Sequence, residues 1–258
     1  MASLVGSRVE RKEDKKLLTG RGKYTADVNF VNQTFAYFVR SPHARAQIKK
    51  VDTSKALKAP GVISVLTGAD IANDKIGGLI AGWKIKSEDG SDMKVPAHPP
   101  LASDTVNYVG DHVAVVIAES LDEARNAAEL VKVDYKILKA VVDTKEAMNS
   151  DQIYKDIPKN LCFDWLLGDR AKVKEAFDKA DKIIKIDLIN NRLVPNAMEP
   201  RAANADYNPS TEEITLYSTS QNPHLARIII SAFNGVAPEN KLRVIAPDVG
   251  GGFGSKIY

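Results

Sequence analysis

The chain has 258 residues, of which 44% are hydrophobic, so it is long enough to form two domains with buried cores. Its 36 basic and 33 acidic residues leave a net charge of +3, which gives no electrostatic basis for binding nucleic acid or an acidic surface. The single cysteine, Cys162, excludes an internal disulfide and a thiolate metal site, and no apolar run resembles a signal peptide or a membrane span, so a soluble, cytoplasmic protein is expected.

The first half of the chain alternates strand and helix patterns. A strand is expected at 34–39, followed by strand–helix–strand units at 47–66 and 105–137 with a loop-rich stretch at 72–99 between them. In the second unit, Ser120 is expected to cap a helix in a capping box with Glu123. Neither unit contains a GxGxxG fingerprint, so this half is predicted to be an α+β or α/β scaffold without a catalytic group.

The second half begins after a predicted boundary between residues 147 and 160, where polar residues and Pro158 interrupt the pattern. A helix is expected to begin at Gly168-Asp169 and to have Val173 and Phe177 on its apolar side. Further strands are expected at 181–189, 213–220 and 241–249. A helix is also predicted between the last two of these strands, with Pro223 in its first turn and Gly235 at its end.

Two of these strands end in loops suited to ligand binding, with the sequences SQNPH and GGGFG. Consecutive glycines let the backbone approach a ligand and point several amides one way, which suits an anion. A tight turn explains the glycine run equally well. The four histidines show no metal-ligand spacing and are interpreted as loop or packing residues: His43, His98, His112 and His224.

Several collinear stretches resemble the large subunits of the molybdenum hydroxylases, the superfamily of xanthine dehydrogenase, aldehyde oxidoreductase and aerobic carbon monoxide dehydrogenase. The similar stretches, which together cover nearly the whole chain, are RVERKEDKKLLTGRGKYTADV, FVRSPHARAQIKKVDTSKALKAPGVISVLTGADI, PLASDTVNYVGDHVAVVIAES, NLCFDWLLGDRAKVKEAF, NRLVPNAMEPRAANADY, STSQNPH and DVGGGFGSK. Within this superfamily, the stretches most resemble the carbon monoxide dehydrogenase-like branch, which includes aldehyde-oxidising members.

The resemblance implies an α+β fold and a role for particular residues. Residues 18–147, after an N-terminal segment 1–17, would form an a/b hammerhead domain, and residues 148–258 the first part of a molybdenum cofactor-binding domain. Gln221 matches the family glutamine that hydrogen-bonds the apical oxo ligand of molybdenum. Phe253 and Gly254 would lie against the metal and the pterin, with Gly251 and Gly252 shaping the loop. Glu199, in MEPR, matches a position near the substrate pocket.

The resemblance also implies what other sequence must supply. Family large subunits are several times longer, and their catalytic glutamate lies beyond the position of Tyr258, so no catalytic residue and no direct metal ligand is assigned here. The expected cofactor is a molybdenum–pterin of the molybdopterin cytosine dinucleotide type, and the expected partners are the rest of the large subunit, an FAD medium subunit and a 2Fe-2S small subunit in an oligomer of heterotrimers. Apolar surface is expected near 244–258, where the rest would dock.

The chain is therefore interpreted as the amino-terminal portion of a molybdenum hydroxylase large subunit, a split or truncated form that is inactive and without cofactor when isolated. Two other classes remain open. One is a non-enzymatic scaffold or assembly protein that retains the fold. The other is an unrelated anion- or nucleotide-binding protein that uses the glycine loop.

Overall fold

The computed structural model describes residues 5–257. Their contacts divide them into two compact units. The central unit is Thr34–Leu193, and the terminal unit combines the described residues up to Gln33 with those from Val194 onward. The predicted domain boundaries at 17/18 and 147/148 fall elsewhere in the chain and remain a proposal about domain organisation.

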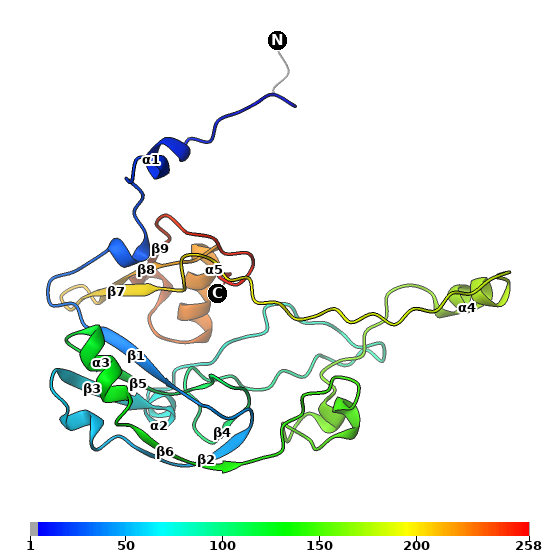
Figure 1. Ribbon diagram of the computed structural model, residues 1–258, viewed down its shortest axis with the longest axis horizontal. Helices are drawn as coiled ribbons and strands as arrows, with labels where there is room; N and C mark the ends of the chain where they lie inside the picture. Colours follow the sequence, from blue (N-terminus) through cyan, green and yellow to red (C-terminus); the bar gives the residue numbers. More distant parts are fainter. Residues whose placement is uncertain (1–4, 258) are drawn as a thin grey trace. The chain divides into compact units, whose positions relative to one another are not determined.

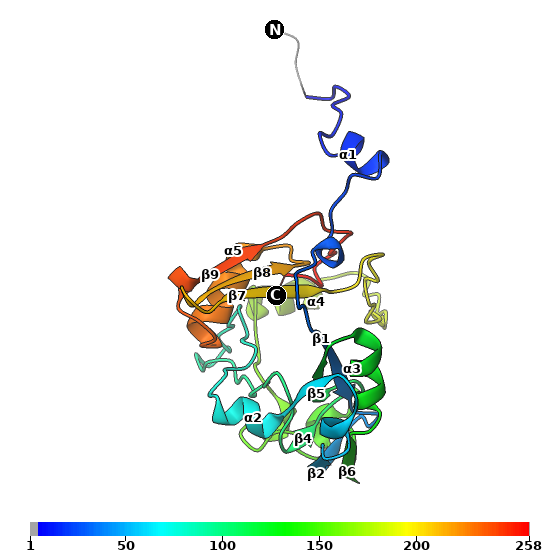
Figure 2. The ribbon, with the colours of Figure 1, turned by 90° about the vertical axis from the view of Figure 1, so that its left-hand side faces the viewer.

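The central unit contains two three-stranded antiparallel sheets (Figures 1 and 2). One has the order β1-β5-β3 and the other the order β4-β2-β6. The strands are β1 Phe35–Arg40, β2 Ala46–Asp52, β3 Val62–Thr67, β4 Thr105–Val106, β5 His112–Ala118 and β6 Lys132–Ile137, and the helices are α2 Gly68–Asn73, α3 Leu121–Ala128 and α4 Arg170–Asp178.

Strand β5 lies at the centre of this unit because both of its faces are apolar. Ala114 and Val116 pack in one core cluster with Ala127 of α3, whereas Val113 packs in a second cluster with Ala46 of β2. A strand buried on both faces reads as a continuous run of β-branched residues, as HVAVVIA does. Its two faces thus give this unit its two cores.

The structure confirms the predicted N-cap of α3. The hydroxyl of Ser120 accepts a hydrogen bond of 3.2 Å from the backbone amide of Glu123. The return half of the capping box differs from the prediction, since the Ser120 hydroxyl itself donates to the Glu123 carboxylate at 2.8 Å.

The expectation of strand–helix–strand units is only partly met. The strands of each predicted unit form, but they are divided between the two sheets. Strand β2 pairs with β4 and β6, whereas β3 pairs with β5. All of these pairings are antiparallel. The first strand of the second unit is short, Thr105–Val106, because the amide of Asn107 donates to the carboxylate of Asp111 at 3.1 Å instead of to a neighbouring strand.

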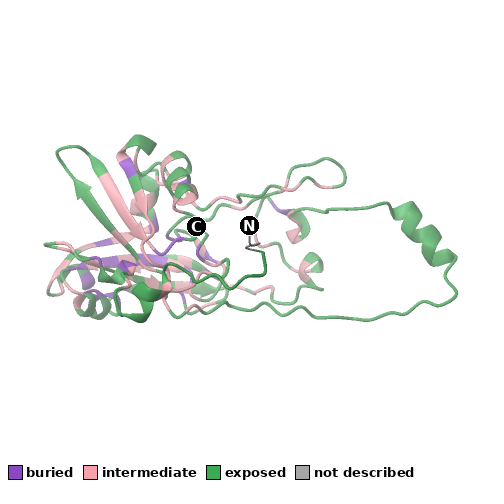
Figure 3. Ribbon diagram, turned by 90° about the horizontal axis from the view of Figure 1, so that it is seen from above, coloured by how far each residue is buried: buried purple, intermediate pink, exposed green. Residues whose placement is uncertain are grey.

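The strand predicted at 181–189 is absent. Residues 181–194 form no helix or strand and, within the described part of the chain, no backbone hydrogen bond. A strand needs a neighbour to pair its backbone groups, and none of the described residues provides one here. Helix α4 begins at Gly168-Asp169, as predicted, with Asp169 as its N-cap. The whole helix is exposed (Figure 3), including its apolar residues Val173 and Phe177.

The terminal unit is built on a three-stranded sheet of order β7-β8-β9, in which β7 and β8 are antiparallel and β8 and β9 parallel. Helix α5 connects β8 to β9 and continues as a π-helical turn over Ile229–Phe233, with Gly235 just after its end at a φ of 71°. The elements are α1 Asp14–Leu18, β7 Ala203–Asn208, β8 Glu213–Ser218, α5 Pro223–Ile228 and β9 Leu242–Ile245. Pro223 stands in the first turn of α5, as predicted.

Candidate functional site

The predicted site residues meet at one edge of the sheet in the terminal unit. Because β8 and β9 are parallel, their carboxyl ends lie at the same edge, and the antiparallel β7 begins there. Gln221 follows β8, the glycine loop 250–254 follows β9, and Glu199 precedes β7. Ligands of open sheets often bind beyond the carboxyl ends of strands, where loops of different origin converge.

Gln221 is fixed against the carboxyl-terminal end of the glycine loop. Its side-chain oxygen, Oε1, accepts hydrogen bonds from the backbone amides of Gly254 at 2.9 Å and Lys256 at 3.2 Å. Its own backbone amide donates to the carbonyl of Lys256 at 2.7 Å. The side-chain nitrogen, Nε2, donates no hydrogen bond within residues 5–257 and is available to a ligand.

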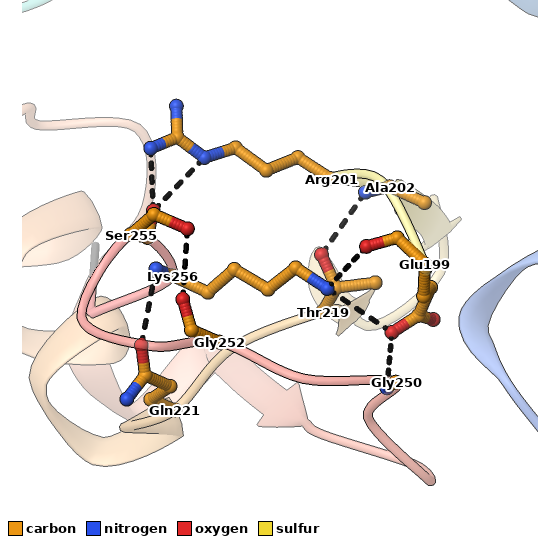
Figure 4. Close-up of polar contacts among 9 residues, drawn as sticks. All are labelled: Glu199, Arg201, Ala202, Thr219, Gln221, Gly250, Gly252, Ser255 and Lys256. Carbon is orange, nitrogen blue, oxygen red and sulfur yellow. Dashed lines mark hydrogen bonds and ion pairs between the residues drawn. The ribbon is translucent and has the colours of Figure 1, made fainter. Parts of the chain in front are cut away.

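Glu199 fixes the opposite end of the loop (Figure 4). Its Oε2 accepts a hydrogen bond from the backbone amide of Gly250 at 2.7 Å and pairs with the Nζ of Lys256 at 3.2 Å. The same ammonium group donates to the backbone carbonyl of Glu199 at 2.7 Å. The side chain of Lys256 is 2% exposed and that of Glu199 14%, so this is a buried ion pair.

Two further contacts hold these segments to the sheet. The amide of Ala202 donates to the hydroxyl of Thr219 at 3.0 Å, which extends the β7–β8 pairing toward the site. The guanidinium group of Arg201 donates through Nε and a terminal nitrogen to the backbone carbonyl of Ser255 (Figure 4). Both contacts lie next to the Glu199–Lys256 pair, because Arg201 is two residues after Glu199 and Ser255 directly precedes Lys256.

The loop can lie this close to its neighbours because it lacks side chains. A Cβ atom on Gly252 would lie 2.4 Å from the Cδ of Gln221, and one on Gly250 would lie 2.5 Å from the Cβ of Glu199. Real Cβ atoms do not approach other atoms so closely, so a side chain at either position would have to displace its neighbour.

The middle of the loop presents groups without partners. The backbone amides of Gly251, Gly252 and Phe253 donate no hydrogen bond to any of the described residues. Phe253 has a φ of 51°, which is rare for a residue other than glycine, and its side chain is exposed. The Oε1 of Glu199 is buried and has no hydrogen-bond partner among the residues that the structure describes. Free amides beside an uncommon backbone conformation fit the binding of an anionic or oxygen-rich group.

The structure thus brings together all six residues that the sequence singled out: Glu199, Gln221, Gly251, Gly252, Phe253 and Gly254. Lys256 and Arg201 were missed. A lysine two residues after the last glycine of a binding loop is a signal that could have been used for Lys256. The contact of Arg201 with a backbone carbonyl has no sequence signature.

Asp248, two residues before the glycine loop, ties the loop to the beginning of the chain. Its carboxylate accepts hydrogen bonds from the Nζ of Lys16 and the backbone amide of Lys23, each at 2.7 Å. The hydrogen bond from the Lys16 ammonium, followed by that from the Lys23 amide, lowers the pKa of Asp248 below its usual value.

Other features of the described chain do not add to this site. A surface pocket of about 450 Å³ lies at the opposite, amino-terminal ends of β8 and β9 and is lined by none of the six residues. Within residues 5–257, no group of three His, Cys, Asp or Glu side chains is placed to hold a metal ion, and no helix is long and apolar enough to cross a membrane.

Comparison with known proteins identifies both halves of the chain. Residues 19–139 match the profile of the aldehyde oxidase and xanthine dehydrogenase a/b hammerhead domain, and residues 153–258 match that of the molybdopterin cofactor-binding domain. The nicotine 6-hydroxylase large subunit of Paenarthrobacter nicotinovorans is 37% identical over 99% of this chain, and the carbon monoxide dehydrogenase large chain of Afipia carboxidovorans is 35% identical over 98%.

The same relationship is evident in three dimensions. The solved structure of reconstituted CO dehydrogenase from Oligotropha carboxidovorans superimposes with a TM-score of 0.86 at 35% identity, over 98% of this chain and 32% of that one. The chain spans 30% and 32% of the two curated relatives named above, about a third of their length. It therefore belongs to the molybdenum hydroxylases, the family of xanthine dehydrogenase, aldehyde oxidoreductase and carbon monoxide dehydrogenase, and corresponds to part of their large subunit.

Proposed function

We propose that this chain forms one wall of the molybdenum–pterin site in the large subunit of a molybdenum hydroxylase similar to carbon monoxide dehydrogenase and aldehyde oxidoreductase. The completed enzyme would oxidise its substrate with oxygen derived from water. The observation that carries the proposal is the clamp between Gln221 and the glycine loop, which leaves the Nε2 of Gln221 and three loop amides free at one sheet edge.

The bound cofactor would supply the two-electron oxidation, and this chain would supply binding and orientation. Gln221 is suited to donate from Nε2 because its Oε1 is already occupied by the amides of Gly254 and Lys256. The amides of Gly251 and Gly252 can donate to cofactor oxygens. The exposed ring of Phe253 can pack against the pterin and exclude water from it. The buried free oxygen of Glu199 provides one acceptor, so the residues present fit such a group.

The remaining parts of the proposed enzyme follow from the family. The catalytic glutamate and the other pterin contacts would come from the rest of the large subunit. The cofactor would be of the cytosine dinucleotide type, and electrons would leave through an iron–sulfur small subunit and an FAD medium subunit in a cytoplasmic oligomer of heterotrimers. The relatives are named as large chains or large subunits, which supports the need for further subunits. Family membership favours this function over a free-standing scaffold or a nucleotide-binding protein.

Purification from the native host tests the proposal. An affinity tag on this chain should recover a complex that contains stoichiometric molybdenum together with FAD and iron, as measured by elemental analysis and absorbance. The chain expressed by itself should retain no molybdenum. A complex without molybdenum would contradict the proposal and favour a scaffold. Tight, saturable binding of nucleotide or phosphate by the chain alone would favour a nucleotide-binding protein instead.

A further inference from the structure

We propose that Lys256 is a positioning residue, whose buried ion pair with Glu199 keeps the glycine loop in the conformation that leaves its central amides free. The geometry of the pair stands by itself. The identity of the ligand that accepts hydrogen bonds from these amides rests on the proposed function.

The first argument is the burial of the charges. The side chain of Lys256 is 2% exposed, and its ammonium group reaches only Glu199 among the described residues, through the side-chain Oε2 and the backbone carbonyl. A buried ammonium is costly unless it is paired and hydrogen-bonded. The loop can therefore adopt this conformation only while Glu199 remains beside Lys256.

The second argument is that one carboxylate oxygen joins both ends of the loop. The Oε2 of Glu199 accepts from the amide of Gly250, the first glycine, and from the Nζ of Lys256, the residue that closes the loop. Lys256 also takes part in the clamp between Gln221 and the glycine loop, because its backbone amide donates to the Gln221 side chain and its carbonyl accepts from the Gln221 amide. Lys256 thus connects two anchors, and the amides between them remain without partners.

The third argument concerns what removal of the ammonium would leave behind. Glu199 already has one buried oxygen without a hydrogen-bond partner. Without Lys256, its carboxylate would be a buried charge with only the amide of Gly250 as a donor. An unpaired buried charge is strongly unfavourable, so the carboxylate should turn toward water and release Gly250.

Hydrogen exchange of the loop amides in this chain tests the proposal. The variants are Lys256→Met, Glu199→Gln and the double variant, with Lys185→Met, an exposed lysine outside the site, as the control. Lys256→Met should accelerate exchange of the Gly250 and Gly254 amides about tenfold or more, and the control should not. The double variant should exchange more slowly than Lys256→Met, because no unpaired charge remains.

Glu199→Gln keeps the size of the side chain and covers the case in which Lys256→Met does not fold. Unchanged exchange at Gly250 in both single variants would overturn the proposal. The second measurement is the molybdenum content of the purified complex after dialysis, which should fall in Lys256→Met and stay unchanged in Lys185→Met. Faster exchange with full molybdenum retention would overturn the link to the cofactor, whereas a parent complex without molybdenum would contradict the proposed function instead.

Discussion

At the scale of single residues, the site depends on the absence of side chains at its glycines as well as on the contacts of Gln221 and Glu199. Gly252 lies so close to Gln221 that a methyl group cannot be placed between them, whereas Gly254 has open space around it but a φ of 86°. The two glycines are therefore needed for different reasons, one for close approach and the other for backbone conformation.

Replacement of Gly252 by alanine should displace the Gln221 side chain and break its bonds to the loop. We expect the free energy of unfolding to fall by about 1–3 kcal/mol, as for other overpacking substitutions, and the amides of Gly254 and Lys256 to exchange faster. Gly235→Ala is the matched control, since it strains the backbone at a φ of 71° in the same unit but away from Gln221. Equal exchange at Lys256 in both variants would show that the clamp is unimportant. Denaturant titration and hydrogen exchange provide the two measurements.

The lowered pKa of Asp248 makes its contacts sensitive to acid. A carboxyl group whose pKa is lower in the folded state stabilises that state above its unfolded pKa, and this contribution disappears as the pH falls through the folded value. We therefore expect the Lys23 amide, which donates to Asp248, to be protected near neutral pH and to lose that protection below about pH 4. Asp248→Asn should have the same protection at pH 3 and pH 7. A parent chain whose Lys23 exchange, corrected for the intrinsic rate, is unchanged by acid would contradict this.

At the scale of elements, the sequence predicted where helices begin more reliably than whether their apolar faces are buried. Ser120 caps α3 as predicted, and α4 begins where predicted with Asp169 as its cap. Each cap accepts from an amide only two or three residues away. The apolar faces of the two helices differ in outcome. The alanines of α3 are buried against β5, whereas Val173 and Phe177 of α4 are exposed.

Ser120→Ala should destabilise the central unit by about 1 kcal/mol, the usual cost of losing an N-cap. The reason is that the amide of Glu123 loses its acceptor at the start of a helix that packs on the core. Urea denaturation followed by circular dichroism measures the change. Ser103→Ala serves as the control, because Ser103 is exposed and its hydroxyl forms no hydrogen bond with the described residues, and it should change the stability by less than about 0.5 kcal/mol.

At the scale of the whole molecule, exposed apolar side chains concentrate in the segment 181–194, and not only at residues 244–258, where the sequence predicted them. Near the loop, Phe253 and Ile257 are exposed but Val244 and Ile245 are half-buried, and Tyr258 lies outside the described residues. The segment has no backbone partner among residues 5–257. Its exposed apolar residues are Ile183, Ile184, Ile186, Leu188, Ile189, Leu193 and Val194. An extended, β-branched stretch of this kind is suited to pair with another strand.

Charged substitutions in this segment should reduce self-association without reducing stability. For Ile184→Lys combined with Ile186→Lys, we expect less binding of a hydrophobic dye and less aggregation, with a free energy of unfolding within about 0.5 kcal/mol of the parent. Val116→Lys, in the core of the same unit, should unfold it. A large loss of stability in the double variant would show that the isoleucines are packed in the isolated chain.

The sequence by itself determined the local features of this protein: the helix caps, the buried strand β5, the turn after α5 and the two loops that follow β8 and β9. The resemblance of its motifs to the molybdenum hydroxylases, and not a local pattern, assigned Gln221 and the glycines to one site. The local signals depend on neighbours within a few residues.

Tertiary structure decided which strands pair, and so separated the members of each predicted strand–helix–strand unit into different sheets. It also left 181–189 without a partner, although the sequence has the composition of a strand, because pairing requires a second strand that composition cannot supply. The ion pair between Glu199 and Lys256 could not be predicted from the sequence either. Fifty-seven positions separate the two residues along the chain, and only the register of β7, β8 and β9 brings their charges together.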